Sequence, residues 1–164
     1  MDILKANAAH LNAIVALNRI VQNLHAKREP GHFRPFDQAA VTAFLRNALD
    51  DPAVTVLLAV EGNHPLGYAL LRVQNRPENA FSLRRSFVEL EQIAVDPNSR
   101  KGGVGSALID QAFAVAQSLG LGELELSVWE FNEDALRLFH RKGFAPCQHR
   151  MRTGRPTNKA APSV

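Results

Sequence analysis

The sequence is poor in the residues that carry redox or metal chemistry. Its 164 residues include one cysteine, Cys147, and six histidines without the spacing of zinc ligands. A single cysteine excludes an internal disulfide and is typical of a reducing compartment, so we expect a cytoplasmic protein without a metal. Cys147 follows no catalytic motif, and we expect a buried, inert thiol there.

Long apolar runs are also missing. No stretch approaches the roughly 20 apolar residues that a bilayer-spanning helix needs, and we expect no membrane association. The first residues, Met1–Lys5, do not have the basic and then apolar layout of a secretion signal. Hydrophobic residues make up 46% of the chain and charged residues 21%, a composition typical of one globular domain.

The positive charge is concentrated at one end. The formal net charge is +3, but residues 150–164 hold four basic residues and no acidic one, which leaves −1 for residues 1–149. Such a segment is more typical of a solvated chain end than of a phosphate-binding patch. We therefore expect one domain over residues 1–152, a flexible basic tail over 153–164 and no nucleic-acid partner.

Hydrophobic periodicity predicts the order β-α-α-β-β-β-α-β-α-β. This order indicates an α/β (α+β) fold, with four helices around a mixed, mostly antiparallel, twisted sheet of about six strands. The expected strands cover residues 2–6, 53–60, 66–73, 86–95, 124–128 and 144–152, and the expected helices cover 8–27, 37–48, 103–119 and 132–143.

The fourth expected strand contains an irregularity. Apolar residues fall at Val88 and Leu90 and then at Ile93 and Val95, so the step of three between Leu90 and Ile93 interrupts the period of two. This spacing predicts a β-bulge near Glu91-Gln92, which would bend the strand and leave main-chain groups unpaired.

A glycine-rich turn follows that strand and opens a helix. It reads Arg100-Lys101-Gly102-Gly103-Val104-Gly105-Ser106, and such a helix start presents unpaired N–H groups to an anion. A P-loop is a poor fit because the lysine precedes the glycines, and a dinucleotide fingerprint is a poor fit because Leu108 stands where its third glycine would be. The structural alternative is a glycine-rich helix start that binds nothing.

The pattern Arg100-x-x-Gly103-x-Gly105 resembles the coenzyme A loop of the general-control-related N-acetyltransferase (GNAT) superfamily. The resemblance extends in order from about residue 2 to residue 152, with Asn132-x-x-Ala135 through Phe144 similar to the closing helix. It implies a GNAT fold, acetyl-CoA as co-substrate and a bulged strand whose freed main chain pairs with the pantetheine arm. The coenzyme-binding residues that it implies are Ile93, Ala94, Val95, Arg100, Lys101, Gly102, Gly103, Val104, Gly105, Ser106, Asn132 and Phe139.

One position departs from the family pattern. Many members carry a tyrosine at the place of Phe139, where it protonates the departing thiolate. Phe139 cannot donate a proton, which leaves water, Ser127 or His140 for this role. His140 is more typical of a surface helix residue.

An amine must lose a proton before it attacks a thioester, and a nearby carboxylate can accept that proton. Glu89 and Glu91 stand two residues apart before the expected bulge and so share a face of the strand. The resemblance favours Glu89 as this base, whereas Glu91 could equally lie on a solvated strand face.

The sequence thus predicts an acyltransferase that moves an acetyl group from acetyl-CoA directly to a primary amine of a small molecule or peptide. A homodimer is a possible assembly. The alternative is a sensor module that holds coenzyme A or a nucleotide without turnover. The segment 31–36, with two phenylalanines between helices, could be a lid over the acceptor site or an ordinary packed loop.

Overall fold

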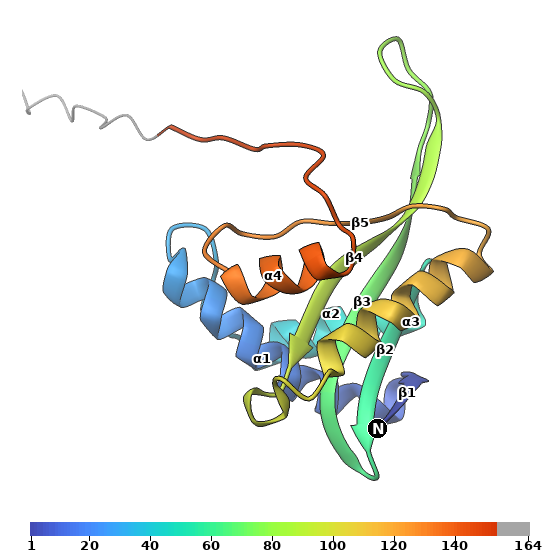
Figure 1. Cartoon of the computed structure of the whole chain (residues 1–164). Helices are drawn as coiled ribbons and strands as arrows, with labels where there is room; N and C mark the ends of the chain where they lie inside the picture. The colour runs from blue at the N-terminus through green and yellow to red at the C-terminus, as the bar shows by residue number, and fades with distance from the viewer. Residues whose placement is uncertain (154–164) are drawn as a thin grey trace, which may run out of the picture.

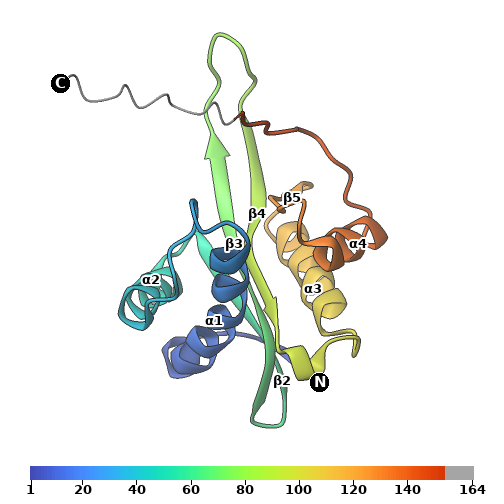
Figure 2. The same ribbon diagram turned by 90° about the vertical axis from the view of Figure 1, so that its left-hand side faces the viewer.

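The computed structural model describes residues 1–153, which form one five-stranded sheet with two helices on each face (Figure 1, Figure 2). The elements follow in the order β1 (Asp2–Lys5), η1 (Ala8–His10), α1 (Leu11–Arg28), α2 (Gln38–Asp50), β2 (Val54–Glu61), β3 (His64–Arg76), β4 (Arg85–Val95), η2 (Pro97–Ser99), α3 (Val104–Ser118), β5 (Leu124–Leu126) and α4 (Glu133–Arg141).

The strands lie in the order β1-β2-β3-β4-β5. Neighbours are antiparallel except β4 and β5, which are parallel because α3 carries the chain from one end of the sheet back to the other. β2 reaches only to Arg72 of β3, so the far ends of β3 and β4 pair with each other alone and project as a hairpin (Figure 1). The predicted mixed, mostly antiparallel sheet is confirmed.

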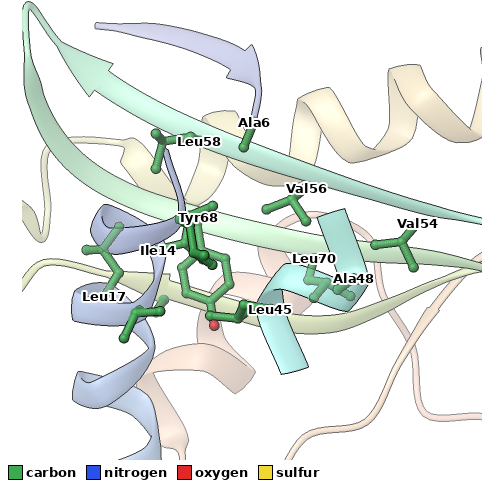
Figure 3. Close-up of a cluster of buried hydrophobic side chains, with 13 residues drawn as sticks. Ala6, Ile14, Leu17, Leu45, Ala48, Val54, Val56, Leu58, Tyr68 and Leu70 are labelled. Atoms are coloured by element: carbon green, nitrogen blue, oxygen red, sulfur yellow. The ribbon is translucent and has the colours of Figure 1, made fainter. Parts of the chain in front are cut away.

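One face of the sheet packs against α1 and α2. Figure 3 shows Tyr68 of β3 lying among Ile14 and Leu17 of α1 and Leu45 of α2. Each of these four residues is at most 3% exposed. At about 25 cal/mol per Å² of apolar surface, such side chains are a main source of the stability of this layer.

The opposite face packs against α3 and α4. Val88 and Leu90 of β4 lie in one buried cluster with Leu108 of α3 and Phe139 of α4. The side chains on β3 and β4 alternate between the two clusters, so the sheet has an apolar core on each face. Both layers are needed to position β4, which lies between them.

The expected sixth strand is wrong. Residues 144–152 form no regular element, and Ala145–Arg152 are exposed. Pro146 has no N–H to give to a ladder, and the segment has no alternating apolar face to bury. Cys147 lies in this segment and is exposed, so the expectation of a buried thiol is also wrong.

The strands β3, β4 and β5 form as expected, but their lengths differ from the prediction. β5 ends at Leu126 and does not reach Val128, because no sixth strand pairs with its outer edge. β3 and β4 extend into the segment 74–85, which lies between the two expected strands. The part of the chain that the structure describes contains no helix long and apolar enough to cross a membrane. The predicted tail, residues 153–164, lies outside the described residues except for its first.

Candidate active site

β4 and β5 separate halfway along β4. Among residues 1–153, the two strands pair only over Val88–Leu90 and Leu124–Leu126, and the rest of β4 has no partner strand on that side. On the other side, the N–H of Asp96 donates to the carbonyl oxygen of Leu66, 2.8 Å away on β3. Because main-chain groups alternate along a strand, the N–H groups of Ile93 and Val95 point to the open edge. We call this open edge the slot.

The predicted bulge is confirmed at Glu91. Gln92 pairs with Leu70 of β3 and Leu90 pairs with Leu71, so Glu91 is the extra residue. The bulge keeps Ile93 and Val95 on the α3 side with Leu90. The buried Ala94 lies instead in the core cluster of α1 and α2.

Five rings hold the chain away from β4 after β5 ends. Trp129 meets Phe33 edge-on with ring centroids 5.3 Å apart, and Phe131 meets His25 at 5.7 Å. Phe33 stacks on His25 at 4.8 Å, and His32 completes the group. His25 lies in the last turn of α1 and Phe33 follows the helix, so this aromatic cluster ties the segment after β5 to the α1 side of the molecule.

The aromatic cluster also bears on the segment 31–36. Phe33 lies within it, and Phe36 packs against the core of α1 and α2. These contacts support the packed-loop interpretation over a free lid. Burial lowers the pKa of His25, because the apolar rings disfavour the imidazolium.

The glycine-rich turn has the backbone that an anion site needs. Gly103 precedes α3 with φ of 81°. The space beside its Cα is open to a ligand, because a Cβ added there would meet nothing within 4 Å. No side chain caps α3, so its first N–H groups, on Val104, Gly105 and Ser106, are free for a ligand.

The two cations of the turn differ in conformation. Arg100 and Lys101 are both exposed beside the start of α3. Lys101 has φ of 64°, a left-handed conformation that a residue with a Cβ adopts at a cost of about 1–2 kcal/mol. The donor set of N–H groups and cations fits a pyrophosphate, and Gly102 and Gly103 leave room for it to approach the backbone.

Gly105 has a different role from Gly103. A Cβ there would lie 3.0 Å from Cδ2 of Leu138 on α4, so this glycine permits close packing of α3 on α4. Asn132 stands directly before α4, and its side chain makes no capping hydrogen bond. Phe139 is 6% exposed and meets Phe144 edge-on, so most of its ring surface contacts the core.

The two predicted carboxylates point to the α2 side of β4, and each is held by β3. Nε2 of Gln74 donates to Oε2 of Glu89 at 2.7 Å. Nε of Arg72 donates to Oε1 of Glu91, also at 2.7 Å. Within residues 1–153, no cation lies within ion-pair distance of Glu89, which distinguishes it from Glu91.

Arg72 joins two acidic groups. Its Nη1 donates to Oδ2 of Asp51, 2.7 Å away at the end of α2. The hydrogen bond to Glu91 raises the pKa of Arg72 further above its ordinary value, and the bond to Asp51 adds to this rise. The pKa of Asp51 is lowered, first by the N–H of Ala53 and then by Arg72. Glu91 is therefore part of a charged cluster that joins the sheet to α2.

The site contains residues that the sequence did not single out. Trp129, Phe131 and His25 form part of the aromatic cluster after β5, and Arg72 forms an ion pair with Glu91. Trp129 is the only tryptophan in the chain, but no periodic pattern connects it to residues about a hundred positions earlier. Among residues 1–153, no group of three or more histidine, cysteine or acidic residues could hold a metal ion.

The structure has the two features that the resemblance to the GNAT superfamily implied. The mixed sheet opens between β4 and β5, and a glycine-rich turn precedes α3. Residues 19–144 match the model of the acetyltransferase (GNAT) family. The chain belongs to this family.

Individual relatives agree with this assignment. An uncharacterized N-acetyltransferase of Methanocaldococcus jannaschii is 38% identical over 61 residues, which cover 37% of this chain and 27% of that protein. The matched part of this chain thus spans about a quarter of that curated relative.

Two solved structures share the fold. A tetramutant of a Bacillus halodurans protein has a TM-score of 0.88 at 22% identity, covering 94% of this chain and 99% of that one. An aminoglycoside N-acetyltransferase in complex with CoA has a TM-score of 0.73 at 21% identity, covering 94% of each chain.

Proposed function

We propose that the chain transfers an acetyl group from acetyl-CoA directly to a primary amine. The observation that carries this proposal is the slot, where the free N–H groups of Ile93 and Val95 lie on the strand that leads to the start of α3. The slot suits an extended arm that pairs with main-chain groups, and the helix start suits the pyrophosphate at the end of such an arm. The same residues were expected from the family resemblance.

Glu89 serves as the base in this proposal. Within residues 1–153, its carboxylate keeps one oxygen free, because Gln74 binds only the other, and no cation lies within ion-pair distance of it. Glu89 takes a proton from the ammonium of the acceptor, directly or through a water molecule, and the neutral amine then attacks the thioester carbonyl carbon. Main-chain N–H groups of the bulged strand bind the carbonyl oxygen as negative charge develops on it.

The thiolate that leaves must gain a proton. Phe139 cannot supply it, and Nδ1 of His140 lies 3.2 Å from the carbonyl oxygen of Phe144. Ser127 follows β5 directly, at the point where β5 leaves β4, and it is exposed. We therefore assign this proton transfer to Ser127 or to water, in preference to His140.

The substitution Gly103→Asp tests coenzyme binding. Asp tolerates the left-handed backbone better than most residues, but its carboxylate would repel pyrophosphate at the start of α3. We expect the affinity for acetyl-CoA, measured by calorimetry, to fall by about tenfold or more. Gly62→Asp is the matched control, because Gly62 also has a positive φ (58°) and open space around it but lies in the turn between β2 and β3. Equal affinities in the two variants would contradict the coenzyme site.

Turnover decides between the enzyme and the alternative sensor. The full chain is incubated with acetyl-CoA and a panel of amines, and thiol release and the acetylated amine are both measured. Acetylation of any amine supports the proposed function. Saturable acetyl-CoA binding without transfer to any amine would favour the sensor, for which the missing tyrosine at Phe139 is the supporting feature. The domain limits of 1–152, the cytoplasmic location and a homodimer stay predictions.

A further inference from the structure

A buried polar network holds the side chain that follows the bulge. The hydroxyl of Tyr68 donates to Oε1 of Gln92 at 2.6 Å. Nδ2 of Asn18, on α1, donates to the Tyr68 hydroxyl oxygen at 2.8 Å and to Oε1 of Gln92 at 3.1 Å. Tyr68 is 0% exposed and Asn18 is 6% exposed, and Gln92 is the only member that reaches the surface.

One atom of this network is buried without a partner. Oδ1 of Asn18 accepts no hydrogen bond. If both amides were turned over, Nδ2 of Asn18 would occupy this position, and its two N–H donors would be buried unpaired instead of one carbonyl oxygen. An unpaired carbonyl oxygen is less unfavourable than unpaired N–H groups. The unpaired oxygen therefore fixes the direction of the network.

The direction of the network fixes what Gln92 offers to a ligand. Oε1 of Gln92 already accepts hydrogen bonds from Tyr68 and Asn18, and burial raises the pKa of the Tyr68 phenol, which keeps its proton available. Oε1 is turned toward β3, so Nε2, on the other arm of the amide, is turned away from β3. Within residues 1–153, Nε2 of Gln92 donates no hydrogen bond.

The geometry points to Gln92 as a specificity-determining residue that binds an oxygen atom of the acceptor, so that the preferred substrates are amines with a hydroxyl or carbonyl oxygen a few bonds from the nitrogen. This inference rests on the proposed function. Nε2 can only donate, so it cannot bind an ammonium, whereas the carboxylate of Glu89 can. Because of the bulge, the two groups lie on the same face of β4, opposite Arg72 and Leu70 of β3, about 7 Å apart between Cα atoms, and can hold the two ends of one such acceptor.

The test compares matched amines that differ in one oxygen. Ethanolamine is paired with n-propylamine, and 2-aminocyclohexanol with cyclohexylamine. For each pair, the ratio of kcat/KM values is measured in the wild type and in Gln92→Leu. Dividing the two ratios cancels the intrinsic reactivity of each amine. We expect the wild type to prefer the oxygen-bearing amine by about tenfold more than Gln92→Leu does.

Three further variants separate recognition from folding. Gln92→Glu keeps an oxygen for Tyr68 and Asn18 but places a second oxygen where Nε2 lies in the wild type, so the preference should be lost or reversed. Tyr68→Phe removes the donor that orients Gln92 and should lower the preference. Gln111→Leu, on an exposed position of α3, is the control and should leave the ratio unchanged.

The outcomes distinguish this inference from the proposed function. Equal ratios in the wild type and Gln92→Leu, with amines acetylated by both, would overturn the role of Gln92 and leave the acetyltransferase activity standing. If Gln92→Leu instead weakens the binding of acetyl-CoA relative to CoA without changing the ratio, the donor faces the acetyl oxygen, which also overturns it. A wild type that acetylates no amine would overturn the proposed function, and this inference with it.

Discussion

At the residue scale, the partners on β3 decide which carboxylate can act as a base. Glu89 and Glu91 have the same chemistry and lie on the same face of β4, but Gln74 is neutral and Arg72 is charged. The guanidinium of Arg72 holds Glu91 in a charged cluster with Asp51, whereas Glu89 has no charged partner among residues 1–153 and keeps one oxygen free for an acceptor. The difference favours Glu89, although the two residues are only two positions apart.

We predict that Glu89→Gln lowers kcat by about 10²-fold at neutral pH and leaves the Michaelis constant for acetyl-CoA nearly unchanged. The amide keeps the shape of the side chain but cannot accept the proton of the ammonium. Steady-state kinetics over a range of pH provide the measurement. The loss should become smaller at high pH, where more of the amine arrives without its extra proton.

Glu91→Gln is the matched control for this prediction. It should change kcat less, and its main effect should be on stability, because Arg72 and Asp51 lose a member of their cluster. Wild-type turnover in Glu89→Gln at every pH would show that Glu89 is not the base. A larger loss in Glu91→Gln would transfer the role to Glu91.

At the element scale, the end of α1 is joined to the chain after β5 by the aromatic cluster, and burial lowers the pKa of one of its two histidines. The pKa of His25 is lower in the folded protein than its ordinary value of about 6.5. As the pH falls through that ordinary value, the unfolded chain binds a proton at His25 before the folded chain does. Protonation of His25 in the unfolded chain therefore favours unfolding in acid. At pH values well above the ordinary pKa of His25, this effect vanishes.

His25→Phe should remove this acid sensitivity while keeping a ring in the cluster. We predict that the free energy of unfolding of the variant, relative to the wild type, rises as the pH is lowered from about 7.5 to about 5. Urea unfolding at the two pH values gives both free energies. The same difference at both pH values would contradict the role of His25, and the measurement at the higher pH reports the packing change alone.

The elements also show which local signals the sequence contained. The step of three between Leu90 and Ile93 is a local signal, and it correctly predicted a bulge that the pairing of β3 and β4 confirms at Glu91. The last strand failed because a strand needs a neighbour, and its formation could not be judged from residues 144–152 alone. The ends of β3 and β4 were missed because their residues are polar on a hairpin that pairs only with itself.

At the scale of the whole molecule, the contacts that shape the site join distant parts of the chain. The turn 100–106 could be recognised because the residues that form it are adjacent in sequence. Arg72 and Glu91, or Asn18 and Gln92, meet only because α1, β3 and β4 pack together. Family resemblance supplied the general position of the coenzyme, whereas the partners of each side chain follow only from tertiary packing.

The separation of β4 from β5 has a consequence for hydrogen exchange with solvent. Along the end of β4, the amides of Ala94 and Asp96 face β3, whereas those of Ile93 and Val95 face the slot. In the free protein, deuterium should therefore enter this strand at every second amide, with fast uptake at Ile93 and Val95. Saturating acetyl-CoA should slow these two amides and remove the alternation, as residue-resolved exchange measured by NMR would report. Uniform uptake along the strand in the free protein would contradict this picture, in which the bound coenzyme acts as the missing strand of the sheet.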